Sequence, residues 1–352
     1  FLGPELDSFV TLRTGQYSVK VVDVNQIYMQ FGDQFVPSSQ AISNYIKFAE
    51  KNLDTKFVLF VGGDSWDYKQ YLYTSKSFIP TQYVRTSGNV FGGIMNRQSP
   101  SDSKYGDLND DGIPDLPIGR FPVRNTTELS NIIEKIRDYE ARVGYKGRIL
   151  MVADKADAGN GISFTRDAIS LIETIPPEWA GSIRKDFRAL PDIDGGTAAR
   201  AKVFAAVNSG VSVTGYIGHS SALRWGSFSS NPALLKAQDI ASFTNIDKPT
   251  LVIQWGCYNT NFVHPRDESM ATLFLNPGLH GAATVLGAST LTGAADEYLL
   301  ASELNKVMYN EGEPIGTAVI KAKKALSLIN PNASDVLLGW QILGDPALVI
   351  NH

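Results

Sequence analysis

The chain has 352 residues, of which 43% are hydrophobic, and it carries a formal net charge of −4. This length allows two ordinary domains or one large α/β unit with a substantial core. No dense Lys and Arg cluster indicates nucleic-acid binding, and no apolar run of about 18 residues predicts a membrane span. A single cysteine cannot form an internal disulfide, so cysteine usage does not identify the compartment.

The sequence begins at Phe1 rather than at Met, which we interpret as the start of an excised or truncated segment. Gly62-Gly63-Asp64 follows the strand expected at 56–61. It lacks the glycine spacing and the Lys of a phosphate loop, so it predicts a structural turn. Periodicity and end signals predict these first elements: a helix that ends near residue 15, a strand at 18–24, a helix at 37–51 and a strand at 56–61.

An acidic run follows a long, aperiodic segment, 65–103, that is rich in Tyr, Ser, Gly and Asn. A loop of this length is uncommon in a compact domain unless it is functional or tied down. Alternating oxygen ligands closed by a glycine turn are typical of calcium loops, although Ile118 stands where such loops carry a bidentate Glu. A calcium site and a solvated turn both remain open here. The candidate ligands are Asp107, Asn109, Asp111 and Asp115.

An amphipathic helix is predicted at 126–142, and the glycines at 144 and 147 end it. We place a boundary here between an N-terminal α/β subdomain, 1–144, and a second subdomain, 145–352. Because strands alternate with helices, we predict largely parallel sheets flanked by helices in an α/β fold. The second subdomain is expected to contain strands at 148–153, 182–187, 211–217, 250–255 and 282–287, and helices at 164–174, 197–209, 296–310 and 316–329.

Two of these strands end in reactive residues. Gly218-His219 follows strand 211–217, and Gly256-Cys257 follows strand 250–255, with a helical crossover expected at 232–242. A lone Cys or His is more often inert than functional. Ligands of open α/β sheets gather at the carboxyl ends of the strands, so neighbouring strands would bring the two residues to one edge. The pattern predicts a nucleophile beside its base.

The residues around this pair resemble the motifs of gingipain-type cysteine peptidases, which belong to the caspase-like clan. The resemblance covers nearly the whole chain, and it implies that the second subdomain is caspase-like and that the first lacks its initial strand. It also implies calcium sites, polypeptide substrates and a secreted or cell-surface bacterial protein. The matching segments are Gly218-His219-Ser220-Ser221 with Trp225-Gly226, Cys257-Tyr258-Asn259 with Phe262, 57–64, 107–122 and 340–348.

The chemistry expected from this resemblance needs no cofactor. The Cys257 thiolate attacks a peptide carbonyl, and His219 protonates the leaving amine and then activates the water that hydrolyses the thioester. By resemblance, the N–H groups of Cys257 and Ser220 form the oxyanion hole, although the family usually has Gly at the position of Ser220. Asp154 matches an acidic position if one gap is allowed, so it either orients the base or is a surface charge.

The same resemblance locates a substrate pocket. Phe164 stands where arginine-specific members carry an acid, and a phenyl ring cannot pair with a guanidinium, so we predict that the protein is not arginine-specific. The opposite wall, 289–298, holds Asp296 and Glu297, which can attract a lysine side chain or cap the next helix. Trp225 is expected beside this pocket.

The main hypothesis is a monomeric cysteine endopeptidase. A non-catalytic scaffold or binding module with the same fold is the alternative from another class. A transpeptidase that processes surface proteins uses the same thioester and is a third hypothesis.

Overall fold

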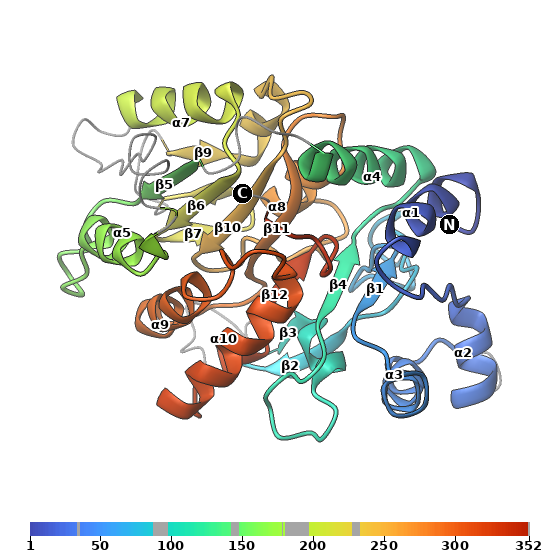
Figure 1. The fold of residues 1–352 in the computed structure, drawn as a ribbon. Coiled ribbons are helices and arrows are strands. Elements are labelled where there is room, and N and C mark those ends of the chain that lie inside the picture. The colour runs from blue at the N-terminus through green and yellow to red at the C-terminus, as the bar shows by residue number, and fades with distance from the viewer. Residues whose placement is uncertain are drawn as a thin grey trace.

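A seven-stranded sheet runs through the computed structural model, with helices along both faces (Figure 1). The structure describes residues 1–33, 36–86, 98–141, 148–177, 179, 197–226 and 233–350. In that part of the chain, no helix is both long and apolar enough to cross a membrane. The strand order is β1-β4-β12-β11-β10-β6-β5. Their bounds are β1 Val58–Val61, β4 Ile118–Phe121, β5 Ile149–Ala153, β6 Val213–Ile217, β10 Thr250–Trp255, β11 Ala282–Ala288 and β12 Trp340–Leu343.

The direction of the strands changes once across the sheet. Strands β5, β6, β10 and β11 are mutually parallel, and so are β1, β4 and β12, whereas β11 and β12 pair in antiparallel fashion. The indoles of Trp255 and Trp340 stack with centroids 4.6 Å apart, one from each group of strands. The prediction of a mainly parallel α/β fold is confirmed. The two groups share one sheet, and β12 of the second predicted subdomain lies among the strands of the first.

Helices cover both faces of the sheet. Figure 1 shows α4 and α7 along one face and α5, α9 and α10 along the other. Every residue of β5, β6, β10 and β11 is buried, which explains why their sequences are continuous apolar runs rather than alternating ones. The helices are α1 Pro4–Thr14, α2 Val24–Phe31, α3 Ser39–Leu53, α4 Thr126–Ala141, α5 Phe164–Glu173, α7 Thr197–Ser209, α8 Met270–Leu275, α9 Ala294–Asn305, α10 Ile315–Ile329 and α11 Ser334–Leu337.

Buried polar contacts fasten the first helix to the rest of the molecule. Arg13 of α1 donates through Nε to Asp345 at 2.6 Å and through its two other nitrogens to Glu140 of α4 at 2.8 and 2.9 Å. Such bidentate pairing fixes orientation as well as distance. Arg13 thereby ties α1 to two distant segments, α4 through Glu140 and the terminal motif found in the sequence through Asp345.

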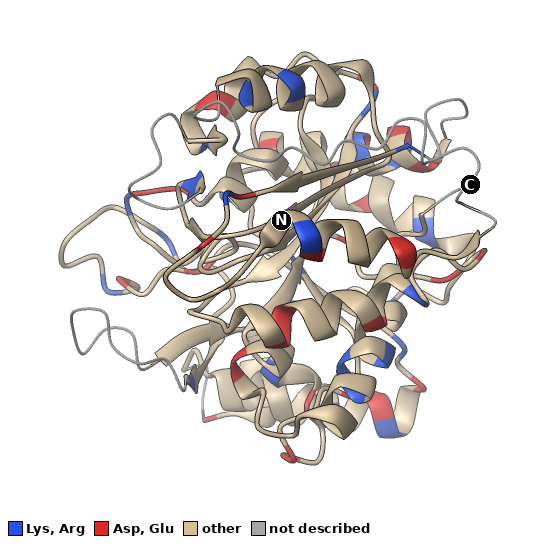
Figure 2. Cartoon of the chain, turned by 90° about the vertical axis from the view of Figure 1, so that its left-hand side faces the viewer, with Lys and Arg blue, Asp and Glu red and all other residues tan. Residues whose placement is uncertain are grey.

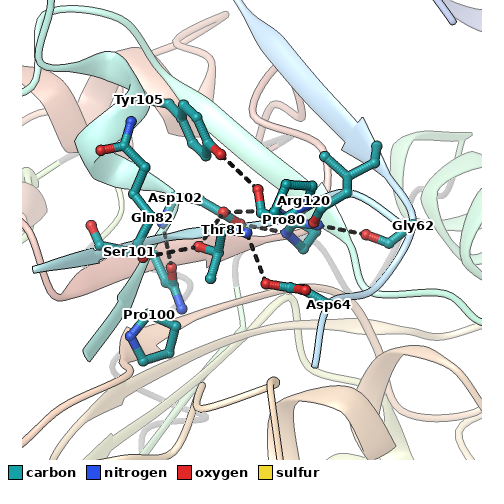
Figure 3. Close-up of polar contacts among 12 residues, drawn as sticks. Gly62, Asp64, Pro80, Thr81, Gln82, Pro100, Ser101, Asp102, Tyr105 and Arg120 are labelled. Atoms are coloured by element: carbon teal, nitrogen blue, oxygen red, sulfur yellow. Dashed lines mark hydrogen bonds and ion pairs between the residues drawn. The ribbon is translucent and has the colours of Figure 1, made fainter. Parts of the chain in front are cut away.

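The long segment 65–103 is tied to the sheet by Arg120 of β4 (Figure 3). The Arg120 guanidinium is fully buried and donates to both carboxylate oxygens of Asp102, at 2.6 and 2.8 Å, and to the carbonyls of Gly62 and Ile79, at 2.6 and 2.9 Å. Thr81 joins the network by donating to Asp102 at 2.8 Å. The segment also contains two short strands, β2 Gln82–Arg85 and β3 Gln98–Ser101, which pair with each other, and it is followed by a 3₁₀ helix, η2 Ser103–Gly106.

Two predicted elements are wrong. Residues 18–23 form no strand, and α2 begins at Val24, because this β-rich run has no neighbouring strand to pair with. In its described residues, the crossover before β10 has short strands and a 3₁₀ helix where an α-helix was expected: β7 Ser220–Ser221, β8 Arg224–Trp225, β9 Leu235–Lys236 and η3 Ala237–Ser242. The predicted strand at 182–187 and the predicted boundary at 144 lie outside the described residues.

Figure 2 shows how the charged residues of the described chain are distributed on one side of the molecule. On the side of the molecule that Figure 2 presents, Lys and Arg are interspersed with Asp and Glu along the helices and loops. A nucleic-acid surface would require a basic patch or stripe.

Candidate active site

Three neighbouring parallel strands end together at one edge of the sheet. In register, Ala153 of β5 lies opposite Ile217 of β6, and Ile217 lies opposite Trp255 of β10. The backbone pairing continues for one more residue, since Asp154 N–H donates to the Ile217 carbonyl at 2.9 Å and Gly218 N–H donates to the Trp255 carbonyl at 3.0 Å. His219 directly follows Gly218, and Cys257 follows Trp255 after one glycine, Gly256.

Close approach of backbones at this edge requires glycine at two positions. Gly218 has φ +155°, and a Cβ there would lie 2.2 Å from Cβ of Asp154. A Cβ on Gly256 would lie 2.4 Å from the Gly218 carbonyl and 2.4 Å from Ser220 Oγ. All three distances are far inside van der Waals contact, so only glycine fits at either position. The two glycines that precede His219 and Cys257 therefore allow their loops to touch.

Ser220 connects the histidine loop to the cysteine loop. Its hydroxyl donates to the Cys257 carbonyl at 2.8 Å and accepts from the Asn259 side-chain amide at 3.3 Å. Asn259 also donates to the Gly256 carbonyl at 2.7 Å. The serine that replaces the glycine usual in the gingipain pattern thus has a structural partner in the turn of the nucleophile.

The His219 imidazole is half-exposed and is held on two sides. Its Nε2 lies 3.0 Å from Asp157 Oδ2, and the Phe164 ring meets it edge-on with centroids 5.3 Å apart. Asn160 donates to the same carboxylate at 2.7 Å, and the pKa of Asp157 is lowered by Asn160 first and by His219 second. Asp157 therefore stays ionised beside the imidazole and can orient it.

Asp154 contacts the backbone of the histidine and not its ring. The carboxylate accepts from the N–H of His219 at 3.2 Å and from the N–H of Lys155 at 2.9 Å. Its side chain is buried, and burial raises its pKa, while the backbone donors and the His219 charge lower it. The acid at the ring is Asp157, which the sequence analysis missed. Its only sequence signal is a position three residues past Asp154, in the loop that leads to Phe164.

Cys257 lies against the loop that follows β11. Its Sγ accepts from Thr292 N–H at 3.5 Å and lies 3.7 Å from both the Thr292 carbonyl and its hydroxyl. Burial, and then the nearby Glu297 carboxylate, raise the pKa of the thiol to about 11, against the opposing effect of Thr292. The thiol is therefore protonated at neutral pH, and a base must remove its proton before attack.

The predicted pocket residues do not all line an open surface. Trp225 is fully buried, stacks on Tyr216 with centroids 4.7 Å apart, and donates from its indole to Gln254 at 2.6 Å, so it packs in the core opposite Ser220 of the histidine loop and does not line an open surface. Phe164 is 3% exposed and faces His219. Asp296 accepts from Asn330 at 2.8 Å, whereas Glu297 is buried near Cys257.

The acidic loop does not present its four predicted ligands to one point. Asn109 donates to Asp111 at 3.0 Å, Asp115 pairs with Lys324 at 2.9 Å, and Lys104 pairs with Asp107 at 2.8 Å. Among the described residues, no group of three or more His, Cys, Asp or Glu side chains is placed to hold a metal. In this arrangement the four side chains bond to one another or to lysines rather than converging, while Asp107 Oδ1 is buried without a hydrogen-bond partner within the described chain.

The mainly parallel α/β fold, with a histidine loop and a cysteine loop in contact at one strand edge, is that of the caspase-like cysteine peptidases. The chain matches the model of peptidase family C25 over residues 2–351 and belongs to this family. It is thus a gingipain-type cysteine peptidase, a hydrolase.

Solved structures give the same fold. The Arg-specific cysteine proteinase gingipain R has a TM-score of 0.71 at 18% identity, over 89% of this chain and 69% of that chain. The complex of the RgpB pro- and mature domains from Porphyromonas gingivalis gives 0.71 at 18% identity, over 89% and 70%. Another structure, described as a protease, gives 0.71 at 16% identity, over 91% and 70%. None of the curated protein sequences matches this chain.

Proposed function

We propose that the protein is an endopeptidase that hydrolyses polypeptides through Cys257 and His219 by way of a thioester. The observation that carries the proposal is the contact between the two strand-end loops, in which Ser220 Oγ bonds to the Cys257 carbonyl at 2.8 Å. Two loops that touch at the carboxyl ends of adjacent parallel strands keep a nucleophile and a base within reach of one substrate.

Each residue has a defined task in this reaction. Nε2 of His219 is engaged by Asp157 at 3.0 Å, so Nδ1 is the nitrogen that takes the thiol proton as Sγ attacks the carbonyl carbon. The same proton then passes to the leaving amine, and the acyl group remains on Sγ. His219 next deprotonates a water that attacks the thioester, and the acid product and the thiol are released. Asp157 stabilises the imidazolium that forms in each step.

The oxyanion is proposed to bind to the backbone N–H groups of Cys257 and Ser220. In support, the Cys257 N–H has no hydrogen-bond acceptor within the described part of the chain, so it is available to the substrate oxygen. A donor preorganised in this way typically contributes a factor of about 100 to 1,000 to turnover. Neither N–H depends on the side chain, so replacement of the usual glycine by Ser220 retains the donor.

Substitution of the two reactive residues tests the proposal. Cys257→Ala is expected to abolish hydrolysis of mixed peptide substrates, and His219→Ala is expected to reduce it at least a hundredfold, with both variants folded. His264→Ala is the matched control, because His264 also has a carboxylate partner, Asp267 at 3.6 Å, and is expected to keep full activity. Full activity of Cys257→Ala would end the peptidase mechanism proposed here. A wild type that cleaves nothing and does not label at Cys257 would favour a binding module.

The preferred residue before the cleaved bond is proposed to be something other than arginine. Phe164 offers an aromatic ring, and a buried guanidinium without a carboxylate or comparable acceptors is strongly disfavoured. A positional scan of fluorogenic peptides is expected to show no preference for arginine as large as tenfold. A tenfold preference for arginine would contradict the assignment of Phe164 to the substrate pocket. Arginine cleavage gained by Phe164→Asp would support this assignment.

A transpeptidase is the second candidate, because a thioester is also intercepted by amines. Addition of an amine such as glycinamide separates the two, since a transpeptidase forms the amide product in place of the acid. We further propose that the protein is monomeric. On the strength of family membership, we propose that it is secreted from, or displayed on, a bacterial cell.

A further inference from the structure

The two N–H groups proposed to bind the oxyanion each belong to a peptide unit whose carbonyl is held in place. The Ser220 N–H shares its peptide unit with the His219 carbonyl. The Cys257 N–H shares its unit with the Gly256 carbonyl. A trans peptide unit is planar, and its N–H points away from its C=O. A group that fixes the carbonyl of such a unit therefore also fixes the direction of its N–H.

The His219 carbonyl is held from β6 by the hydroxyl of Tyr216. Tyr216 is buried, and its ring stacks on the indole of Trp225 with an interplanar angle of 5°. The hydroxyl donates to the His219 carbonyl and accepts from Gly226 N–H at 2.8 Å. The Gly226 N–H also donates to the same carbonyl at 2.8 Å. Two donors therefore fix the His219 carbonyl, and one of them is a side chain.

The register of β7 and β8 leaves the Ser220 N–H outside the strand pairing. Ser220 lies opposite Trp225, next to the pair His219 and Gly226, which a backbone hydrogen bond joins. In an antiparallel ladder, hydrogen-bonded pairs alternate with pairs that exchange no backbone hydrogen bonds. The Ser220 N–H thus points away from β8, which leaves it available to a substrate oxygen.

The Gly256 carbonyl is held in the same manner by the side chain of Asn259. Asn259 is buried, and its amide donates to the Gly256 carbonyl at 2.7 Å and to Ser220 Oγ at 3.3 Å. A Cβ on Gly287 would lie 2.1 Å from Asn259 Oδ1, so the glycine at this position of β11 makes room for the side chain. Asn259 thereby fixes the peptide unit that carries the Cys257 N–H.

We propose that Tyr216 and Asn259 are positioning residues that preorganise the oxyanion hole, each by bonding to the carbonyl behind one of its N–H donors. Both side chains are buried and act through the backbone. Donors that are already aimed at the oxyanion need no reorganisation as the tetrahedral intermediate forms, so they stabilise the transition state more than the bound substrate. The inference rests on the proposed function of Cys257 and on the assignment of the oxyanion hole to these two N–H groups.

Tyr216→Phe removes the hydroxyl and keeps the stacked ring. Its kcat on a fluorogenic peptide is expected to fall at least tenfold with KM within threefold of wild type, because only the transition state loses stabilisation. Alkylation of Cys257 by iodoacetamide forms no oxyanion, so its rate is expected to stay within twofold. The matched control is Tyr105→Phe, which removes the hydroxyl that another buried tyrosine donates to the Pro80 carbonyl at 2.6 Å (Figure 3). It is expected to keep the wild-type kcat.

Asn259→Ala tests the second peptide unit independently. Its kcat is expected to fall at least tenfold, again with an alkylation rate within twofold of wild type. Asn245→Ala is the matched control, because Asn245 is also buried and donates to a backbone carbonyl, that of Gly281 at 2.9 Å. It is expected to keep the wild-type kcat. Tyr216→Phe carries the test alone if Asn259→Ala does not fold.

Two results would overturn the proposal. A fall in alkylation rate that matches the fall in kcat would show that the side chains act on the thiol or its base and not on the oxyanion hole. A folded variant with the wild-type kcat would overturn the role of the residue that it replaces. Neither result affects the proposed function, which fails if Cys257→Ala retains peptidase activity.

Discussion

At the scale of single residues, the geometry assigns different tasks to two neighbouring acids. Asp154 holds the backbone of His219, at 3.2 Å from its N–H, and Asp157 holds the ring, at 3.0 Å from Nε2. An acid that contacts the ring can fix its tautomer and stabilise its charged form, whereas one that contacts the backbone fixes only the loop. The acid that supports the base is therefore Asp157.

Asp157→Asn is expected to lower kcat/KM at least tenfold, because the neutral amide cannot stabilise the imidazolium. The carboxylate has a pKa below its usual range, so it supports the imidazolium at neutral pH and loses this ability only as the pH falls through that lowered pKa. The measurement is kcat/KM from pH 5 to pH 9. Asp267→Asn, beside His264, is the control and should match the wild type. Activity of Asp157→Asn within twofold of wild type at every pH would contradict the role.

Sequence reasoning succeeded for residues whose position follows from a strand end. His219 and Cys257 each follow a buried apolar run and a glycine, and these runs became β6 and β10. It missed Asp157 and Thr292 because both lie in loops without periodicity, where the chain direction is set by contacts such as the paired backbone groups of Asp157 and Ile162. A local pattern cannot show which of two acids, three residues apart, turns toward a ring.

At the scale of elements, apolar continuity predicted strands well and propensity alone did not. Helix α7 and strand β10 both have the predicted bounds, and β10 is buried along its whole length, as its continuous apolar run indicates. Residues 18–23 carry β-branched side chains but find no partner strand, since the pairing of an edge depends on the whole sheet. The helix predicted at 37–51 begins after Ser38, whose hydroxyl caps it by accepting from Ala41 N–H at 3.2 Å.

The loop 107–115 provides the prediction at this scale. We keep the proposal that it binds calcium, because Asp107 Oδ1 is buried and unpartnered in the described chain and because an ion that displaced Lys104 would gain the other oxygen. Chelation of calcium is expected to lower the melting temperature, since an ion bound by the folded state alone stabilises it. Asp107→Asn should remove the effect, and Asp54→Asn, an exposed acid paired with Lys56, should not. Identical melting curves with calcium and with chelator would make the loop a plain turn.

At the scale of the whole molecule, the sheet unites the two halves of the sequence. Residues 340–343 cross back to lie between β4 and β11, where the strand direction reverses. The terminal motif was visible in the sequence, yet its place was not, because a pairing across more than 200 residues leaves no local periodicity. The fold class could be predicted from alternating elements, whereas the join between the halves required the structure.

The most direct test of the account is the site of attachment of a peptidyl chloromethyl ketone. Mass spectrometry of the digested adduct is expected to find the peptide on Cys257, with hydrolysis lost in proportion to labelling and with much slower labelling in His219→Ala. Hydrolysis that persists after complete labelling of Cys257, or that is lost while Cys257 remains unmodified, would contradict the assignment of Cys257 as the nucleophile.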